Sequence, residues 1–209
     1  GTSAGLGVKP ASDYTFMVFV TPVGPYFKKG IRPLNLKITD QYHRAAPKGI
    51  GNIKAIGNYS ASLYPLSQAK DEGYDEVVYL DAADGKRIEE VGSANFFIYK
   101  DGVLKTPSLS GSILNGVTRD SVCVVAKDVL NIEVEETDLY IDDIEHADEI
   151  FCTGTAVVVS PVGKITFNEK TYEINQNEMG PITKKIRETI LAIQREESED
   201  IYGWLKQIR

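Results

Sequence analysis

ANFFIYKDGVLKT, residues 94–106, is the stretch that decides the fold class. The aromatic and β-branched residues at 94–100 predict a strand, Asp101-Gly102 predicts a tight hairpin turn, and residues 103–106 predict the returning strand. Working outward, similar signals predict further strands at residues 14–21, 35–38, 76–81, 132–137, 150–153, 157–160, 164–167 and 171–174. The first of these, YTFMVFVT, is expected to be buried because it is apolar throughout.

Helical patterns alternate with these strands. Helices are expected at residues 60–72, at residues 118–129 and after Gly180-Pro181. The apolar faces that support the first and last of them are Leu63, Leu66 and Ala69, and Ile182, Ile186, Ile190 and Ile193. Pro65 is expected in the first turns of its helix, where proline is tolerated. This mixture of α and β elements, with several hairpins, argues against a doubly wound parallel sheet.

Composition narrows the function class. The chain has 209 residues and a net charge of −7 without a long basic run, which argues against a nucleic-acid partner. No apolar stretch approaches the roughly 20 residues that cross a bilayer, so no membrane segment is expected. The first ten residues lack a signal-peptide pattern, which favours the cytoplasm.

Histidines and cysteines offer little for hydrolytic or metal chemistry. His43 and His146 lie far apart among polar neighbours, which argues against a Ser-His-Asp or metal-dependent mechanism. Cys123 and Cys152 are too few for a disulfide framework or a zinc site, and both are expected to be small buried residues. No metal is therefore predicted.

Lys54 is an isolated charge between GIGNI and AIGNY. On its own such a lysine is typical of a solvated surface residue. The alternative is a desolvated amine with a lowered pKa, which can add to a carbonyl group and form a Schiff base.

Glu89 and Glu90 are adjacent carboxylates on an expected extended segment, so they should point to opposite faces. The inward carboxylate needs a positive partner or several donors, and a protonated pyridine nitrogen would be such a partner. Two solvated glutamates before a turn remain the alternative.

Two turns could hold a phosphate. LNGVT, at residues 114–118, runs directly into a helix, where free N–H groups favour an anion. TGTA, at residues 153–156, offers hydroxyls and close backbone approach. Each signal alone is weak, because glycine turns before helices are common.

Together and in this order, these motifs resemble the branched-chain aminotransferases, which belong to fold type IV of the pyridoxal-phosphate enzymes. The matching stretches are SAGLGVKP (3–10), TPVGPYF (21–27), KAIGNY (54–59), EEVGSAN (89–95), LSGSILNGVTRD (109–120), GTAVVVSPV (154–162) and DIYGW (200–204). The resemblance implies an α/β large domain with mixed sheets in a pseudo-barrel and flanking helices, as in D-amino-acid aminotransferase.

The resemblance also implies the roles of individual residues. Lys54 would carry pyridoxal 5'-phosphate as a Schiff base and shuttle the proton, Tyr59 would bind the phenolate oxygen, and Glu90 would bind the pyridine nitrogen, with Glu89 facing solvent. The residues implied for the phosphate are Val117, Thr118 and Thr155, and those implied for the substrate are Tyr26, Ser93, Thr155 and Ala156.

The implied reaction is transamination of leucine, isoleucine or valine with 2-oxoglutarate, giving the 2-oxo acids and glutamate, in a homodimer. Residues 1–24 would be remnant strands of a small N-terminal domain, 25–50 an interdomain segment and 51–209 the large domain. The chain is then a fragment without the phosphate-binding arginine of that N-terminal domain. Three alternatives stay open: an inactive isolated domain, a D-amino-acid aminotransferase and an aminodeoxychorismate lyase.

Some positions depart from the family pattern. Ser93 and Ala94 stand where threonine and methionine are usual, and the serine keeps the hydroxyl. Ile56 replaces a glycine and Asn115 replaces a proline. Val157 and Ser160 occupy the positions of a Cys-x-x-Cys pair found in some animal members, so that redox switch is not expected.

Overall fold

The structure of the protein, a computed structural model, describes residues 1–22 and 30–207. Its internal contacts divide the chain into Gly1–Gly30 and Ile31–Arg209. Each unit is described by itself.

In the first unit, the described residues 1–22 contain no helix or strand. The prediction of a buried strand at residues 14–21 is therefore wrong for this chain, and its apolar side chains are exposed, with Phe16 at 92% and Val20 at 91%. A strand needs a neighbouring backbone to complete its hydrogen bonds. The backbone contact found in the described part of this unit is made elsewhere, between Thr2 N–H and Asp13 O.

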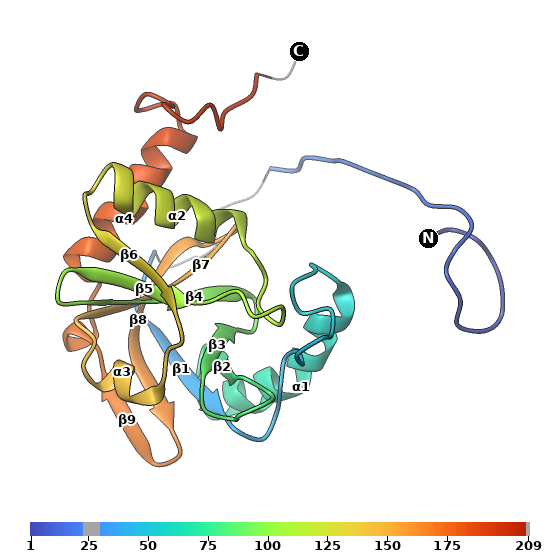
Figure 1. Ribbon diagram of the computed structural model, residues 1–209, viewed down its shortest axis with the longest axis horizontal. Coiled ribbons are helices and arrows are strands. Elements are labelled where there is room, and N and C mark those ends of the chain that lie inside the picture. Colours follow the sequence, from blue (N-terminus) through green and yellow to red (C-terminus); the bar gives the residue numbers. More distant parts are fainter. Residues whose placement is uncertain (23–29, 208–209) are drawn as a thin grey trace. The chain divides into compact units, whose positions relative to one another are not determined.

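In the second unit, the described residues form a nine-stranded mixed sheet (Figure 1). The strands are β1 (Leu34–Thr39), β2 (Glu76–Leu80), β3 (Ile88–Val91), β4 (Ala94–Lys100), β5 (Val103–Pro107), β6 (Glu133–Thr137), β7 (Glu149–Gly154), β8 (Val158–Phe167) and β9 (Lys170–Glu173). Eight of them follow the order β3-β2-β1-β8-β7-β4-β5-β6, and β9 pairs with β8 off this path. An additional β3–β4 pairing closes six of the strands into a ring. The expected pseudo-barrel is thus present, and β1, expected in a connecting segment, is one of its strands.

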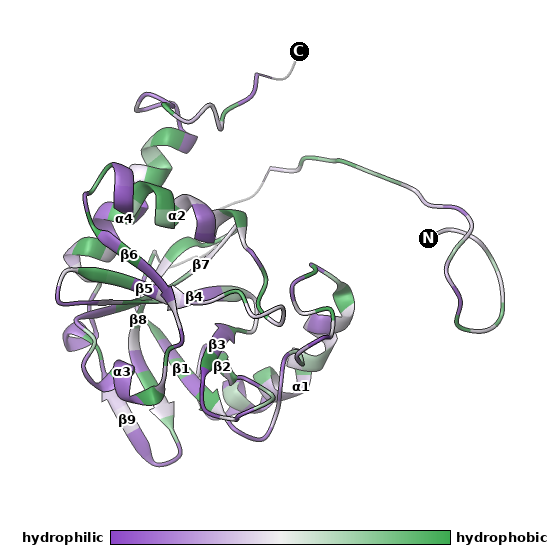
Figure 2. Cartoon of the chain, in the orientation of Figure 1, coloured by the Kyte–Doolittle hydropathy of each residue, from purple (hydrophilic) through white to green (hydrophobic). Residues whose placement is uncertain are grey.

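The helices are α1 (Ile56–Asp71), α2 (Val117–Asp128), α3 (Ile141–Glu145) and α4 (Pro181–Gln194), with a 3-10 turn at Asn175–Asn177. Helix α1 packs against β2, whereas α2 and α4 lie side by side against β7 (Figure 1). Green and purple segments alternate around α2 and α4 in Figure 2, as expected for helices that bury one face. No helix among the described residues is long and apolar enough to span a membrane.

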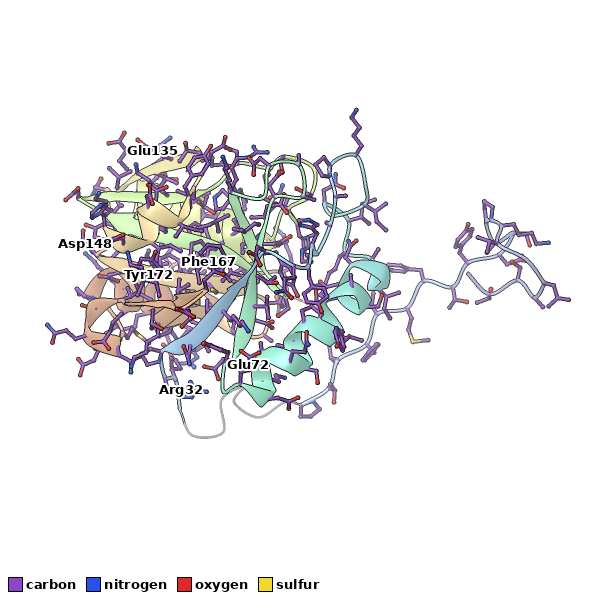
Figure 3. All side chains as sticks on the ribbon, turned by 90° about the horizontal axis from the view of Figure 1, so that it is seen from below. Arg32, Glu72, Glu135, Asp148, Phe167 and Tyr172 are labelled. Carbon is purple, nitrogen blue, oxygen red and sulfur yellow. The ribbon has the colours of Figure 1, made fainter. Side chains whose placement is uncertain are left out.

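Two apolar cores follow from this arrangement. The first fills the ring of strands with residues such as Leu36, Val78, Phe96 and Ile165. The second lies beneath α2 and α4 and includes Ile186, Ile190 and Ile193, which confirms most of the isoleucine face predicted for the last helix. On the β8–β9 hairpin, Phe167 and Tyr172 pack against the first core (Figure 3).

Several local predictions are confirmed. Strand β4 has the expected bounds, and Asp101 (φ 50°) and Gly102 (φ 87°) form the left-handed turn of the hairpin. Two predicted strands, at residues 157–160 and 164–167, are a single strand β8. The strand continues through Pro161 because β7 pairs with its first half and β1 with its second.

The buried face of α1 differs from the prediction. Leu63 is 65% exposed, and the buried residues are Asn58, Ser62, Pro65 and Ala69. The Asn58 amide donates to the carbonyls of Ile50 and Ile53, both at 2.8 Å, which fixes this face inward. The helix begins at Ile56, so Pro65 lies in its interior rather than in its first turns.

Candidate active site

A cavity of about 240 Å³ opens where four chain segments meet. The segments are the loop and first turn of α1, the β3–β4 connection, the β5–α2 loop and the end of β7. Among the residues expected in the site, those that line this cavity are Lys54, Tyr59, Glu90, Ser93, Val117, Thr118 and Thr155. Ala156 follows Thr155 in the exposed turn without lining the cavity. Tyr26 lies outside the described residues.

Lys54 and Tyr59 stand at one side of the cavity. The Lys54 amine lies 5.6 Å from the centre of the Tyr59 ring. The lysine is exposed, whereas a desolvated amine was the functional expectation. The loop before it is held closely, because Gly51 packs so tightly on the Ser112 carbonyl that a Cβ at this position would overlap with it. The chain therefore fixes the backbone near Lys54 and leaves the amine accessible.

Glu90 is the buried acid of the cavity, with 3% of its surface exposed. Its Oε1 accepts from the Arg44 guanidinium and from the Leu114 N–H at 3.1 Å. Among the described residues, Oε2 has only a long contact of 3.4 Å from the Asn95 amide. Burial raises the pKa of Glu90 to about 7 although Arg44 and the Leu114 N–H lower it. One carboxylate oxygen thus remains for a further donor in the cavity.

Arg44 was missed by the sequence analysis. Its guanidinium also donates to Gly51 O at 3.1 Å and to Ser112 O at 3.0 Å, so it ties the Lys54 loop to the β5–α2 loop and to Glu90. A buried carboxylate needs a positive partner, and this requirement was the signal that a nearby basic residue exists. Sequence separation hid it, because Arg44 precedes Glu90 by 46 residues.

Glu89 is also buried, which corrects the expectation that it faces solvent. Val78 pairs with Val91 and Leu80 pairs with Ile88, so two residues of β3, Glu89 and Glu90, lie opposite one residue of β2. This β-bulge breaks the alternation of faces. Both carboxylates then point toward the β5–α2 loop, where the Ser112 hydroxyl donates to Glu89, and burial raises the pKa of Glu89.

The N-terminus of α2 forms another wall. Gly116 is the N-cap, and the first N–H groups of the helix, at Val117 and Thr118, have no acceptor within the helix. A Cβ on Gly116 would overlap with the Asn95 side-chain oxygen, and the Asn95 amide donates to Leu114 O at 2.8 Å. Asn95 therefore contacts both the helix start and Glu90. The free N–H groups at the start of α2 are suited to bind an anion.

The β7–β8 hairpin completes the cavity. Gly154 pairs with Val158, so Thr155, Ala156 and Val157 form the turn. The Thr153 hydroxyl is buried without a hydrogen-bond partner among the described residues. Together with the α2 terminus, this turn offers hydroxyl and amide donors to the cavity that Glu90 also lines.

Comparison with known proteins gives the family. The amino-transferase class IV family matches residues 1–165. The chain belongs to this family. Branched-chain-amino-acid aminotransferase 5 of Arabidopsis thaliana, a chloroplastic protein, is 45% identical over 208 residues, which are 100% of this chain and 50% of that protein. The Bacillus subtilis branched-chain-amino-acid aminotransferase 2 is 39% identical, over 99% of this chain and 58% of its own length.

Solved structures of class IV aminotransferases share the fold. The Escherichia coli branched-chain amino acid aminotransferase superposes with a TM-score of 0.80 at 35% identity, over 90% of this chain and 60% of that one. The Thermobaculum terrenum enzyme in its PLP form gives 0.76 at 27% identity, over 85% and 56%. The fold type IV prediction is thereby confirmed.

This chain spans about half the length of the curated relatives that it matches. The cytoplasmic location expected from the sequence stays a prediction, because several plant relatives are named for the chloroplast or the mitochondrion.

Proposed function

We propose that this chain is the cofactor-bearing part of a branched-chain aminotransferase that transfers the amino group of leucine, isoleucine or valine to 2-oxoglutarate, with pyridoxal 5'-phosphate bound at Lys54. The observation that carries the proposal is the convergence of Lys54, the buried Glu90 and the free N-terminus of α2 on one cavity. The names of the relatives support the reaction and its substrate class.

The cavity suits this cofactor at both of its polar ends. Glu90 Oε2 is available to accept from a protonated ring nitrogen, since its one contact in the part of the chain that the structure describes is the 3.4 Å approach of the Asn95 amide. The N–H groups of Val117 and Thr118 and the Thr155 hydroxyl are donors for a phosphate. When bound, pyridoxal phosphate supplies a carbonyl group that bonds to amines and a ring that draws electrons from the substrate.

The residues of the chain then have distinct tasks. With pyridoxal phosphate bound, the Lys54 amine would hold it by condensing with its carbonyl group, with release of water, and as a free amine would carry the proton from the substrate Cα. Glu90 would keep the ring nitrogen protonated, and the Tyr59 hydroxyl would donate to the ring oxygen. Ser93 and the amides of Thr155 and Ala156 would bind the substrate carboxylate, and the substrate contact proposed for Tyr26, which lies outside the described residues, rests on the family resemblance alone.

The test is reductive labelling. The chain is incubated with pyridoxal phosphate, reduced with borohydride and digested, and the labelled peptide is identified by mass spectrometry. We expect the label on Lys54, its loss in Lys54→Ala and its retention in Lys48→Ala, the neighbouring exposed lysine. A label on another lysine contradicts the site, whereas a label on Lys54 without turnover of leucine supports an isolated, inactive domain.

The proposal extends to the organisation of the longer protein. We infer that residues 1–24 belong to a small N-terminal domain and 25–50 to the segment joining it to the large domain; the division of the chain after Gly30 falls within that segment. We also infer a homodimer, as the family resemblance implies. Analytical ultracentrifugation of the longer protein checks the assembly, and a monomer at micromolar concentration contradicts it.

A further inference from the structure

The turn that follows β7 contains an unusual backbone conformation. Gly154 pairs with Val158 across a three-residue turn, and Val158 has a φ of 57°. Such turns commonly end in a left-handed residue, but glycine or asparagine normally occupies that position. A left-handed β-branched residue is rare, because its side chain crowds the backbone. Val158 is nonetheless 8% exposed and packed in the core beneath α4, so the conformation is held from outside the turn.

Arg187 of α4 makes the contacts that hold it. One guanidinium nitrogen, Nη1, donates to both Val157 O and Val159 O at 2.7 Å, the two carbonyls that flank Val158. Two oxygens at this distance from one nitrogen are separated by no more than twice 2.7 Å. Two residues of regular strand rise about 6.6–6.8 Å. The bridge therefore fits the contracted, left-handed backbone better than an extended one.

The guanidinium has no competing partner in the described part of the chain. No ion pair of Arg187 is found among the described residues, and its charge is met by the two carbonyls. Burial, with a smaller contribution from the nearby positive charge of Arg195, lowers the pKa of Arg187. A half-buried arginine that spends its donors on backbone carbonyls is placed to fix that backbone.

Helix α4 is itself anchored at the other end of β7. Glu149, the first residue of β7, accepts from the Ile182 N–H at 2.9 Å, the Thr183 N–H at 2.7 Å and the Thr183 hydroxyl at 2.6 Å. Arg187 lies one helical turn beyond Thr183 on the same face of α4. The start of β7 thus positions α4, and α4 in turn reaches back to the hairpin at the end of β7.

We propose that Arg187 is a positioning residue that holds Val158 left-handed and thereby presents Thr155 to the cavity. That the turn binds phosphate and substrate carboxylate rests on the proposed function. That Arg187 holds the backbone of the turn does not depend on it. The proposal links the C-terminal helix to the donor groups of the site, although α4 contributes no side chain to the cavity lining.

Hydrogen exchange tests the mechanical role on the chain without cofactor. We expect Arg187→Leu to speed exchange in the peptide spanning residues 153–160 by at least tenfold, because it removes both charge-assisted hydrogen bonds and the loss of one alone corresponds to about tenfold. Lys184→Ala, which removes an exposed cation from the same helix, is the matched control and should leave that peptide unchanged. In a Val158→Gly background, which loses core packing but adopts the left-handed conformation without the bridge, Arg187→Leu should speed exchange much less than it does in the unmodified chain.

The outcomes separate the two proposals. Unchanged exchange in Arg187→Leu, or an equal acceleration by Arg187→Leu in the Val158→Gly background, overturns the role of Arg187. Titration with pyridoxal phosphate provides the second measurement: Arg187→Leu should raise its dissociation constant about tenfold in the unmodified chain and less in the Val158→Gly background. If the exchange results are as expected but the unmodified chain shows no borohydride label on Lys54, the proposed function fails and the positioning role stands.

Discussion

Replacing Arg44 by methionine will remove the guanidinium from a carboxylate that is buried beside it. Side chains of Arg44 and Glu90 are 4% and 5% exposed, so water cannot take the place of the lost partner. Glu90 would retain the Leu114 N–H and the long Asn95 contact. Removing one partner of a buried ion pair costs about 3–5 kcal/mol when the other stays charged, and we expect the loss in the free energy of unfolding to approach this value only at the alkaline end of the range, near pH 9.

The loss should depend on pH. In the unchanged protein burial raises the pKa of Glu90 to about 7, above the usual carboxyl value of 4.5. The folded state therefore favours protonated Glu90, which contributes roughly 3 kcal/mol to stability. This contribution is complete below pH 4.5 and is lost as the pH rises through 7. Without Arg44, which lowers that pKa, Glu90 stays neutral to higher pH. Near pH 5, Arg44→Met should lose only the hydrogen bonds from Arg44 to the Gly51 and Ser112 carbonyls, which lowers the free energy of unfolding by about 1–2 kcal/mol.

Urea unfolding followed by circular dichroism, at intervals between pH 5 and pH 9, measures this difference. Arg32→Met is the control, because Arg32 pairs with Asp75 at the surface with 59% of its side chain exposed, and it should lose less than about 1 kcal/mol. The double variant Arg44→Met/Glu90→Gln should lose less free energy of unfolding than the sum of the losses of the two single variants. A loss that is equal at pH 5 and pH 9, or strict additivity, would refute the argument that the ion pair is coupled to burial.

Three further changes have defined outcomes. Gly116→Ala forces a Cβ against the Asn95 oxygen and should weaken pyridoxal-phosphate binding by at least tenfold, measured by absorbance titration; unaltered affinity contradicts the proposed phosphate site. Glu149→Ala removes three hydrogen bonds at the start of α4 and should lower the free energy of unfolding, measured in urea, by about 3 kcal/mol. If the charge of Glu149 is essential, Glu149→Gln should not regain this stability. Thr153→Val replaces a hydroxyl without a partner in the described chain and should leave the melting temperature equal or higher, whereas a clear decrease would show that the hydroxyl is bonded.

Local signals in the sequence account for the elements they concern. The hairpin at β4–β5 follows from strand residues around Asp101-Gly102, because turn chemistry acts over a few residues. The isoleucine face of α4 follows from helical spacing. In both cases the interaction that selects the structure lies within the segment itself.

The β-bulge shows where local reasoning fails. Strict alternation predicts that Glu89 and Glu90 face opposite sides, and nothing in the two residues reveals that one extra residue is inserted opposite β2. The bulge exists because Val91 and Ile88 both enter the core inside the ring of strands. The same limitation applies to α1, whose buried face is set by Asn58 and its carbonyl partners rather than by the apolar Leu63.

By itself the sequence determined the secondary structure near strong turns and helix starts, and the order of motifs that identifies the family. Only the tertiary structure decided which groups meet: Arg44 with Glu90 across 46 residues, and Arg187 with the turn at Val158 across about 30. The physical reason is that propensity and periodicity act along the chain, whereas burial and ion pairing act between segments that only the folded chain brings together.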